Sequence, residues 1–191
     1  MLKIFLDIDG VVRNWDSGVC QLFGLGDVLV RSWDTIENLA LERGVVKTGK
    51  EFWEKQTSDF WAGLKMYQHA HDFLSMLEDL VGKKNICLLT APTLTSAGGT
   101  QKWIRKNMPY FFNSKQYLIG PAKHFVAGAG KLLIDDKDDN VIKFREAGGE
   151  AIVFPQPWNS MSKLHRNGWK YVIEELRRFS LDIKRQCKRD Y

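Results

Sequence analysis

Short apolar runs that end in polar side chains recur along the chain. Residues 4–6, 86–89 and 132–134 are runs of this kind, and two more short strands are predicted over 116–119 and 151–154. Continuous apolar runs without alternation are typical of strands that are buried on both faces of a parallel sheet. The pattern therefore predicts a central parallel sheet.

Helical periodicity occupies most of the chain between these strands. Apolar side chains at Phe73, Leu74, Leu77 and Leu80 have the spacing of one helix face and predict a helix over 69–80. Further helices are predicted over 32–43, 48–55, 102–106, 141–147 and 168–178, with a loop at 98–99. Alternating strands and helices define the α/β class. The stretch from 14 to 76 has no comparable strand run, which indicates a helical insertion after the first strand.

Length and charge are those of an ordinary folded domain. With 191 residues, of which 44% are hydrophobic, the chain is long enough for one domain with its own core. The net charge of +5 favours an anionic substrate through electrostatic steering. Part of this charge lies in residues 184–189, which we interpret as a solvated helix end rather than a site for nucleic acid or an anionic surface.

Cysteine usage and hydropathy indicate the cellular compartment. Cys20, Cys87 and Cys187 are too few and too scattered for a disulfide framework or a metal cage, which favours a reducing environment. No apolar stretch approaches the length of a membrane span, and residues 1–6 have the pattern of a strand rather than of a signal peptide. We therefore expect a soluble, cytoplasmic protein.

Acidic and hydroxyl side chains follow three of the predicted strands. Asp7 and Asp9 end the first run, and because side chains alternate along a strand they share one side. Thr90 ends the second run, and Asp135 and Asp136 end the third. The carboxyl ends of parallel strands meet at one edge of a sheet, where α/β proteins bind ligands. Closely spaced buried carboxylates require a cation to stay ionised, and oxygen ligands favour Mg²⁺.

The order of these motifs resembles the haloacid dehalogenase (HAD) superfamily of phosphohydrolases. The motifs read DIDGVV, LLTAP, a lysine within GPAKHFVAGAGK, and LLIDDKDD, and the resemblance is nearest to the 5'(3')-deoxyribonucleotidase branch over about residues 2–160. It implies a Rossmann-like three-layer α/β sandwich with a central parallel sheet and a small helical cap inserted after the first strand. We expect the core to comprise residues 1–14 and 77–191, and the cap residues 15–76.

The resemblance also assigns roles to the acids. Asp7 is expected to be the nucleophile that forms an aspartyl-phosphate, and Asp9 the acid that protonates the leaving oxygen and then the base that activates water. Mg²⁺ is expected to bind Asp7, the backbone carbonyl of Asp9, Asp135 and Asp136, with Asp136 as the direct ligand and Asp135 acting through water. The alternative is a structural acidic pair, or a cation site without turnover. Two more acids, Asp138 and Asp139, are interpreted as the N-cap and first turn of the next helix.

Phosphate contacts are expected from the second and third motifs. The Thr90 hydroxyl and the backbone N–H of Ala91 can donate to phosphoryl oxygens, although Ala91 stands where this branch usually has a serine. Lys123 is the candidate for the lysine of the third motif, and Lys131, which starts a strand at the far end of the sheet, is the alternative.

Aromatic residues of the insertion suggest how the organic part of a substrate is bound. The resemblance implies a base pocket, for which the candidates are Trp15, Trp53, Phe60 and Trp61, while at least half of the insertion's aromatics, which include Phe52 and Tyr67, are expected to form its core. Trp103 is likewise interpreted as core. Arg13 and Asn14 depart from the small or acidic residues common in the family.

Three functional hypotheses follow. The leading one is a Mg²⁺-dependent phosphomonoesterase that hydrolyses nucleoside monophosphates, and deoxyribonucleotides in particular. The second is a phosphatase of the same mechanism that acts on polynucleotide 3'-ends or a small phosphometabolite, and the third is a non-catalytic binding protein with the same fold. The expected partner is a small-molecule nucleotide, without a membrane or nucleic-acid role, and the oligomeric state stays open, a homodimer included.

Overall fold

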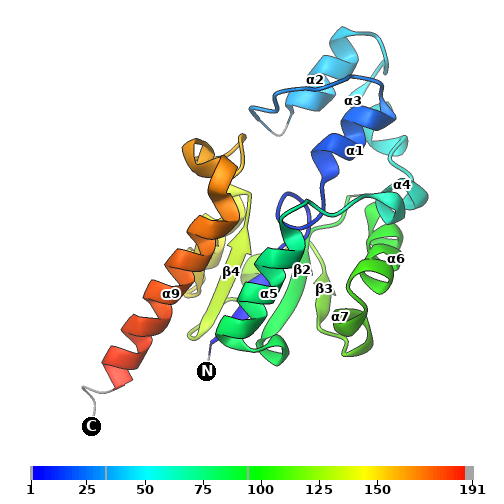
Figure 1. Cartoon of the computed structure of the whole chain (residues 1–191). Helices are drawn as coiled ribbons and strands as arrows, with labels where there is room; N and C mark the ends of the chain where they lie inside the picture. Colours follow the sequence, from blue (N-terminus) through cyan, green and yellow to red (C-terminus); the bar gives the residue numbers. More distant parts are fainter. Residues whose placement is uncertain (1, 33, 94, 188–191) are drawn as a thin grey trace.

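A parallel sheet forms the centre of the molecule. The computed structural model describes residues 2–32, 34–93 and 95–187, and of residues 180–187 the backbone alone. The strands are β1 (Lys3–Leu6), β2 (Ile86–Thr90), β3 (Tyr117–Ile119), β4 (Lys131–Asp135) and β5 (Glu150–Val153). They lie in the order β3-β2-β1-β4-β5, and all neighbouring pairs are parallel (Figure 1). The predicted α/β fold with a central parallel sheet is confirmed.

The register of the strands brings three of their ends together. Leu6, at the end of β1, pairs with Leu88 of β2 on one side and with Ile134 of β4 on the other. β1 occupies the middle of the sheet, so the residues that follow it lie between the ends of β2 and β4. The acids and the hydroxyl that follow these strands consequently meet at one edge.

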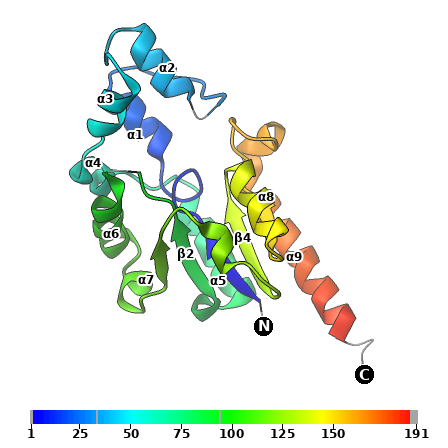
Figure 2. The same cartoon turned by 180° about the vertical axis from the view of Figure 1, so that it is seen from behind.

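Helices cover both faces of the sheet. Helices α5 (Ala70–Val81) and α9 (Gly168–Cys187) lie side by side on one face, and α8 (Asp138–Glu146) lies on the other (Figures 1 and 2). The short helix η2 (Lys123–Val126) packs beside α8. The remaining core elements are α6 (Ser96–Asn107), α7 (Pro109–Asn113), η1 (Lys83–Asn85) and η3 (Ser162–Asn167).

Alternation along the strands divides the core into two apolar clusters. Ile4 and Leu6 join the larger cluster with the apolar side chains of α5, α6 and α9, whereas Phe5 packs into the smaller one with α8. Consecutive side chains of a strand point to opposite faces, so a continuous apolar run can fill both clusters. This explains why the strands lack a polar face.

Four helices of the insertion lie above the carboxyl edge of the sheet (Figure 1). They are α1 (Trp15–Leu22), α2 (Thr35–Glu42), α3 (Gly49–Glu54) and α4 (Ser58–Gly63). Side-chain oxygens begin three of them: Asn14 accepts from Ser17 N, Thr48 from Glu51 N and Thr57 from Phe60 N. Such caps satisfy N–H groups that have no partner within the helix.

The chain enters and leaves the insertion through two adjacent segments. Asn14 N donates to Lys65 O at 2.9 Å, and Tyr67 N donates to Val12 O at 2.9 Å. Helix α5 is one continuous helix beside α9, so the boundary expected at residue 76 falls inside it. We propose that the insertion instead ends at Tyr67, just before α5.

The loop expected at residues 98–99 is wrong, because both glycines lie within α6. A Cβ atom on Gly99 would be 2.3 Å from Ser58 O and 2.6 Å from Trp61 Cβ. Glycine here lets α4 approach the α6 backbone closely, and the packing outweighs the low helix propensity of glycine. Helix α8 also begins earlier than predicted: Asp138 and Asp139 do lie in its first turn, but Lys137 occupies the N-cap position.

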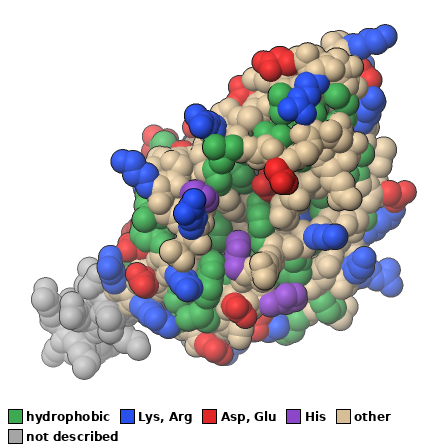
Figure 3. All heavy atoms as spheres, turned by 45° about the horizontal axis from the view of Figure 1, so that its top comes forward, with side chains coloured by type: hydrophobic (Ala, Val, Ile, Leu, Met, Phe, Trp, Pro, Cys, Tyr) green, Lys and Arg blue, Asp and Glu red, His purple; other side chains and the backbone are tan. Residues whose placement is uncertain are grey.

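Charged side chains are interspersed on the surface. In Figure 3, basic side chains of the described residues are spread around the outline, with acidic ones between them. The basic segment 184–189 continues α9 as far as Cys187, and its last two residues lie outside the described part of the chain. None of the described helices is long and apolar enough to cross a membrane.

Candidate active site

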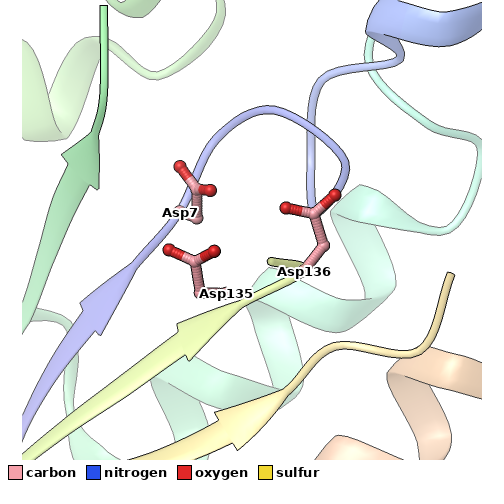
Figure 4. Close-up of side chains that lie close together, drawn as sticks. All are labelled: Asp7, Asp135 and Asp136. Carbon is pink, nitrogen blue, oxygen red and sulfur yellow. The ribbon is translucent and has the colours of Figure 1, made fainter. Parts of the chain in front are cut away.

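Three carboxylates converge at the edge of the sheet. Asp7 directly follows β1, Asp135 is the last residue of β4, and Asp136 comes next. Their side chains point toward one another (Figure 4), and one oxygen from each lies within 4.8 Å of the others. All three are buried. Strand register alone brings them together from residues more than a hundred positions apart.

Burial and mutual repulsion destabilise the ionised form of this cluster. Burial, and after it the charge of Asp135, raises the pKa of Asp7 to about 8, against the opposing effect of Lys123. Burial and the charges of Asp7 and Asp135 raise the pKa of Asp136 well above its ordinary value. A bound cation would favour the ionised forms, because it offsets both effects.

Lys123 is a buried cation between two of the acids. Its Nζ lies 2.8 Å from Asp7 Oδ1 and 2.6 Å from Asp135 Oδ2. Burial alone would lower the pKa of Lys123, but the charges of Asp7 and Asp135 outweigh it and raise the pKa. Lys131, the alternative from the sequence, begins β4 and so lies at the opposite end of the strand.

Asp135 and Asp136 differ in how their oxygens are used. Both oxygens of Asp135 accept hydrogen bonds, from Lys123 and Asn140 side chains and from Lys137 N at 2.9 Å. Asp136 Oδ2 accepts from the indole N–H of Trp158 at 2.8 Å, whereas its buried Oδ1 has no partner among the described residues. An unpaired buried carboxylate oxygen next to two other acids is what a cation site offers, so the donor set fits Mg²⁺.

The segment after β5 supports this arrangement, and sequence reasoning missed it. Asn159 Nδ2 donates to Asp136 O at 2.8 Å, and Gln156 donates to Gly10 O. Gly10 has φ 74°, and a Cβ atom there would lie 2.0 Å from Asp136 Oδ2, so only glycine fits. The signal was available: Gln156, Trp158 and Asn159, whose side chains all carry N–H donors, follow a fifth strand whose end lies at the same edge.

Asp9 is paired with a residue from the turn that follows it. Its Oδ1 and Oδ2 lie 2.7 Å from Nε and Nη2 of Arg13. The Asp9 side chain keeps 18% of its surface exposed, while Arg13 is fully buried. This arginine was noted in the sequence only as a departure from the family.

A cavity of about 240 Å³ lies between the sheet edge and the insertion. It is lined by Asp7, Asp9, Trp15, Trp53, Trp61, Thr90, Ala91, Pro92, Thr93, Lys123, Asp136, Lys137 and Asn140. The lining thus combines Asp7, Asp9 and Asp136 with most of the expected phosphate and base contacts.

The insertion's aromatics differ in their relation to this cavity. Trp15 and Trp53 stack on each other, with ring centroids 5.9 Å apart. Trp61 has the Arg13 guanidinium over its ring at 5.1 Å. Phe60 lines a separate cavity between α1 and α4, and Phe52 is buried in the insertion's core against Phe23. The structure therefore brings three of the four candidates for the base pocket to the cavity.

Three buried polar atoms of the cavity residues, two that can donate a hydrogen bond and one acceptor, have no partner within the described chain. The buried side-chain atoms that lack a partner there are Trp61 Nε1, Thr93 Oγ1 and Asp136 Oδ1. All three residues line the same cavity. Unpaired buried polar atoms cost about 1–3 kcal/mol each, so their concentration here indicates a ligand site.

The chain is similar to several solved structures at low sequence identity. A haloacid dehalogenase-like hydrolase from Burkholderia xenovorans, named as putative, superposes with a TM-score of 0.50 and 14% identity, over 85% of this chain and 86% of that one. A haloacid dehalogenase-like family hydrolase from Streptococcus pneumoniae gives 0.49 and 14%, over 80% and 84%. A HAD family enzyme from Bacteroides thetaiotaomicron, in complex with magnesium and inorganic phosphate, gives 0.43 and 14%, over 86% and 99%.

The parallel sheet and the sheet-edge acids, together with the family match over residues 1–178, define a hydrolase of the HAD superfamily. Within it, residues 1–178 match the family described as 5' nucleotidase, deoxy (pyrimidine), cytosolic type C protein, and the chain belongs to that family. The resemblance found in the sequence motifs is confirmed. No curated relative matches the chain.

Proposed function

We propose that this protein is a Mg²⁺-dependent phosphomonoesterase that hydrolyses nucleoside monophosphates, deoxyribonucleotides in particular, through an aspartyl-phosphate on Asp7. The observation that carries the proposal is the cluster in which Lys123 contacts Asp7 and Asp135 while Asp136 keeps one oxygen unpaired among the described residues. The family match supports the nucleotide class.

The hydrogen bonds of Asp7 favour one oxygen as the nucleophile. Ile8 N donates to Oδ1 at 2.7 Å and Lys123 also contacts Oδ1, so within the described chain Oδ2 is the less engaged atom. Oδ2 would attack phosphorus while the bond from phosphorus to the substrate's ester oxygen breaks, and that oxygen would take a proton from Asp9. Water would then lose a proton to Asp9 and attack phosphorus, which breaks the bond to Oδ2 and releases inorganic phosphate.

Asp7, Asp136 and the backbone carbonyl of Asp9 would hold Mg²⁺, and Asp135 would act through a coordinated water. Asp135 suits the indirect role because its oxygens already accept from Lys123, Lys137 and Asn140. The ion would neutralise charge on the phosphoryl oxygens. Lys123, the Thr90 hydroxyl and the Ala91 N–H would bind the same group from the protein side.

The far side of the cavity suits a nucleobase. Trp15 and Trp53 offer aromatic surface for stacking. The unpaired donors of Trp61 and Thr93 would give hydrogen bonds to acceptor atoms, which nucleobases provide as carbonyl oxygens and ring nitrogens. Since the ring of Trp61 is covered by Arg13, we expect this residue to contact a base through its N–H edge.

A second candidate is a small phosphometabolite. The cavity of about 240 Å³ is below the roughly 300–1,000 Å³ typical of ligand pockets, which favours a compact organic group.

Hydrolysis of 5'- and 3'-monophosphates, compared with sugar phosphates and 3'-phosphorylated oligonucleotides in the presence of Mg²⁺, tests the proposal. We expect the largest kcat/KM for a deoxyribonucleoside monophosphate. Preference for a sugar phosphate would favour the second candidate, and an absence of hydrolysis on every substrate would refute the catalytic role.

A further inference from the structure

Arg13 is fully buried, and its guanidinium group is held by hydrogen bonds and by two aromatic rings. Its Nε and Nη2 form a fork on the two oxygens of Asp9, both at 2.7 Å, and Nη2 also donates to Thr100 Oγ1 at 3.0 Å. The guanidinium lies between two indoles, 5.1 Å from the ring of Trp61 and 5.2 Å from that of Trp103. Few rotamers are compatible with so many contacts.

These contacts come from three different parts of the fold. Trp61 belongs to α4 of the insertion, Thr100 and Trp103 belong to α6 of the core, and Asp9 lies at the sheet edge. The indole N–H of Trp103 donates to Leu64 O at 2.7 Å, which ties α6 to the chain just beyond α4. The position of Asp9 is therefore set by the packing of the insertion on the core.

The fork holds the Asp9 carboxylate in one orientation and still leaves it able to act on a substrate. Each carboxylate oxygen has about two lone-pair directions, and the fork occupies one on each. The side chain remains partly exposed and lines the cavity beside Asp7. Without the fork, Asp9 would be free to rotate about its side-chain torsions.

We propose that Arg13 is a positioning residue that holds the Asp9 carboxylate in its reactive orientation, with Trp61, Thr100 and Trp103 as the frame that fixes Arg13. The inference rests on the proposed function, since it takes the proton-transfer role of Asp9 from there. It extends that function by linking proton transfer to the contact between α4 and α6.

A double-mutant cycle on the full chain tests this role, with p-nitrophenyl phosphate and Mg²⁺. Arg13→Met should lower kcat at least about tenfold and change KM less than about threefold, because it affects the chemical step and not binding. Asp9→Asn should lower kcat by about 10²–10⁴, the usual contribution of an acid–base group. If Arg13 acts only through Asp9, the double variant should be within about threefold of Asp9→Asn alone.

Two further variants separate positioning from folding. Arg13→Lys keeps the buried cation but not the fork, so we expect it to recover thermal stability and not kcat. Thr100→Val removes one hydrogen bond that fixes Arg13 but leaves the fork in place, so we expect it to lower kcat by less than Arg13→Met does. If Arg13→Met causes the same fold-loss in the natural protein and in the Asp9→Asn variant, or if Arg13→Lys recovers kcat, the inference is overturned. An inactive natural protein would instead refute the proposed function, and the role of Arg13 with it.

Discussion

The indole N–H of Trp158 donates to Asp136 Oδ2 at 2.8 Å, while Asp136 Oδ1 has no partner among the described residues. Trp158 follows β5, the edge strand next to β4, so it reaches the site from a strand that carries none of the three clustered acids. Hydrogen bonds to metal ligands of this kind fix the direction of the coordinating oxygen.

Trp158→Phe should weaken Mg²⁺ binding about 10–100-fold, because Asp136 loses the donor that orients it. The midpoint of activation by Mg²⁺, measured as activity against metal concentration, checks this. Trp169→Phe is the matched control, since Trp169 packs against the apolar core and is absent from the cavity lining. An unchanged midpoint in Trp158→Phe would mean that Asp136 does not need this donor.

Asp7→Asn should abolish turnover, with a loss of at least about a thousandfold, because an amide cannot form the acyl phosphate. Asparagine has the size of aspartate, so the melting temperature should show that the fold persists. Asp9→Asn should accumulate a phosphorylated protein with a good leaving group, since hydrolysis of the intermediate needs the base. Phosphate found on any residue other than Asp7 would show that the nucleophile is misassigned.

Mg²⁺ should stabilise the protein more at high pH than at low pH. The pKa of Asp7 is raised from 3.8 to about 8, and that of Asp136 is also raised, so between these values the metal-free folded state binds more protons than the unfolded chain. Its stability should therefore fall as pH rises from about 4 to about 8. The lowered pKa of His69 acts in the opposite direction below its ordinary value of 6.5, where the unfolded chain binds the extra proton.

Melting temperatures in EDTA and in Mg²⁺, measured at about pH 5 and about pH 8, check this prediction. We expect the shift caused by Mg²⁺ to be larger at the higher pH, where the ion can bind without displacing protons. Equal shifts at both values would contradict a buried, partly protonated acidic cluster.

Trp53→Ala should cost about 1–3 kcal/mol of nucleotide recognition if Trp53 stacks on a base. Hydrolysis of p-nitrophenyl phosphate, which needs only the sheet edge, should fall much less. Phe60→Ala is the control, because Phe60 is a nearby aromatic that lines a different cavity. Equal losses on both substrates in Trp53→Ala would indicate damage to the insertion rather than lost stacking.

Thr93→Val keeps the shape of the side chain and removes a hydroxyl that has no partner within the described chain. We expect KM for the preferred nucleotide to rise about tenfold, the value of one hydrogen bond, with stability unchanged or slightly improved. A loss of stability with KM unaffected would show that the hydroxyl serves the fold.

The sheet-edge acids could be predicted from sequence because each lies at the end of a strand or directly after it. Once residues 4–6 and 132–134 are identified as neighbouring parallel strands, Asp7, Asp135 and Asp136 must lie close together. No such rule exists for Arg13 or Trp158. Their partners are fixed by the packing of α4 on α6 and by the path of the chain after β5, which local periodicity does not contain.

The same limit explains the incorrect loop at residues 98–99. Two consecutive glycines lower helix propensity, and the close packing of Gly99 against Ser58 outweighs this preference. That contact joins α6 to a segment about forty residues earlier in the chain, so a local pattern cannot reveal it.

Backbone hydrogen bonds between residues 12–14 and 65–67 join the two crossings by which the chain enters and leaves the insertion. The insertion is therefore a module whose two ends are held together. Changes of length or sequence between these crossings that keep the contact of α4 with α6 would leave the ends of the core strands in place, so substrate range could diverge while the phosphate chemistry stays constant. The buried contact of Arg13 with Trp61 limits which sequences the insertion can adopt. A transplanted insertion would have to supply an equivalent aromatic partner, or the recipient core would need a different residue at position 13.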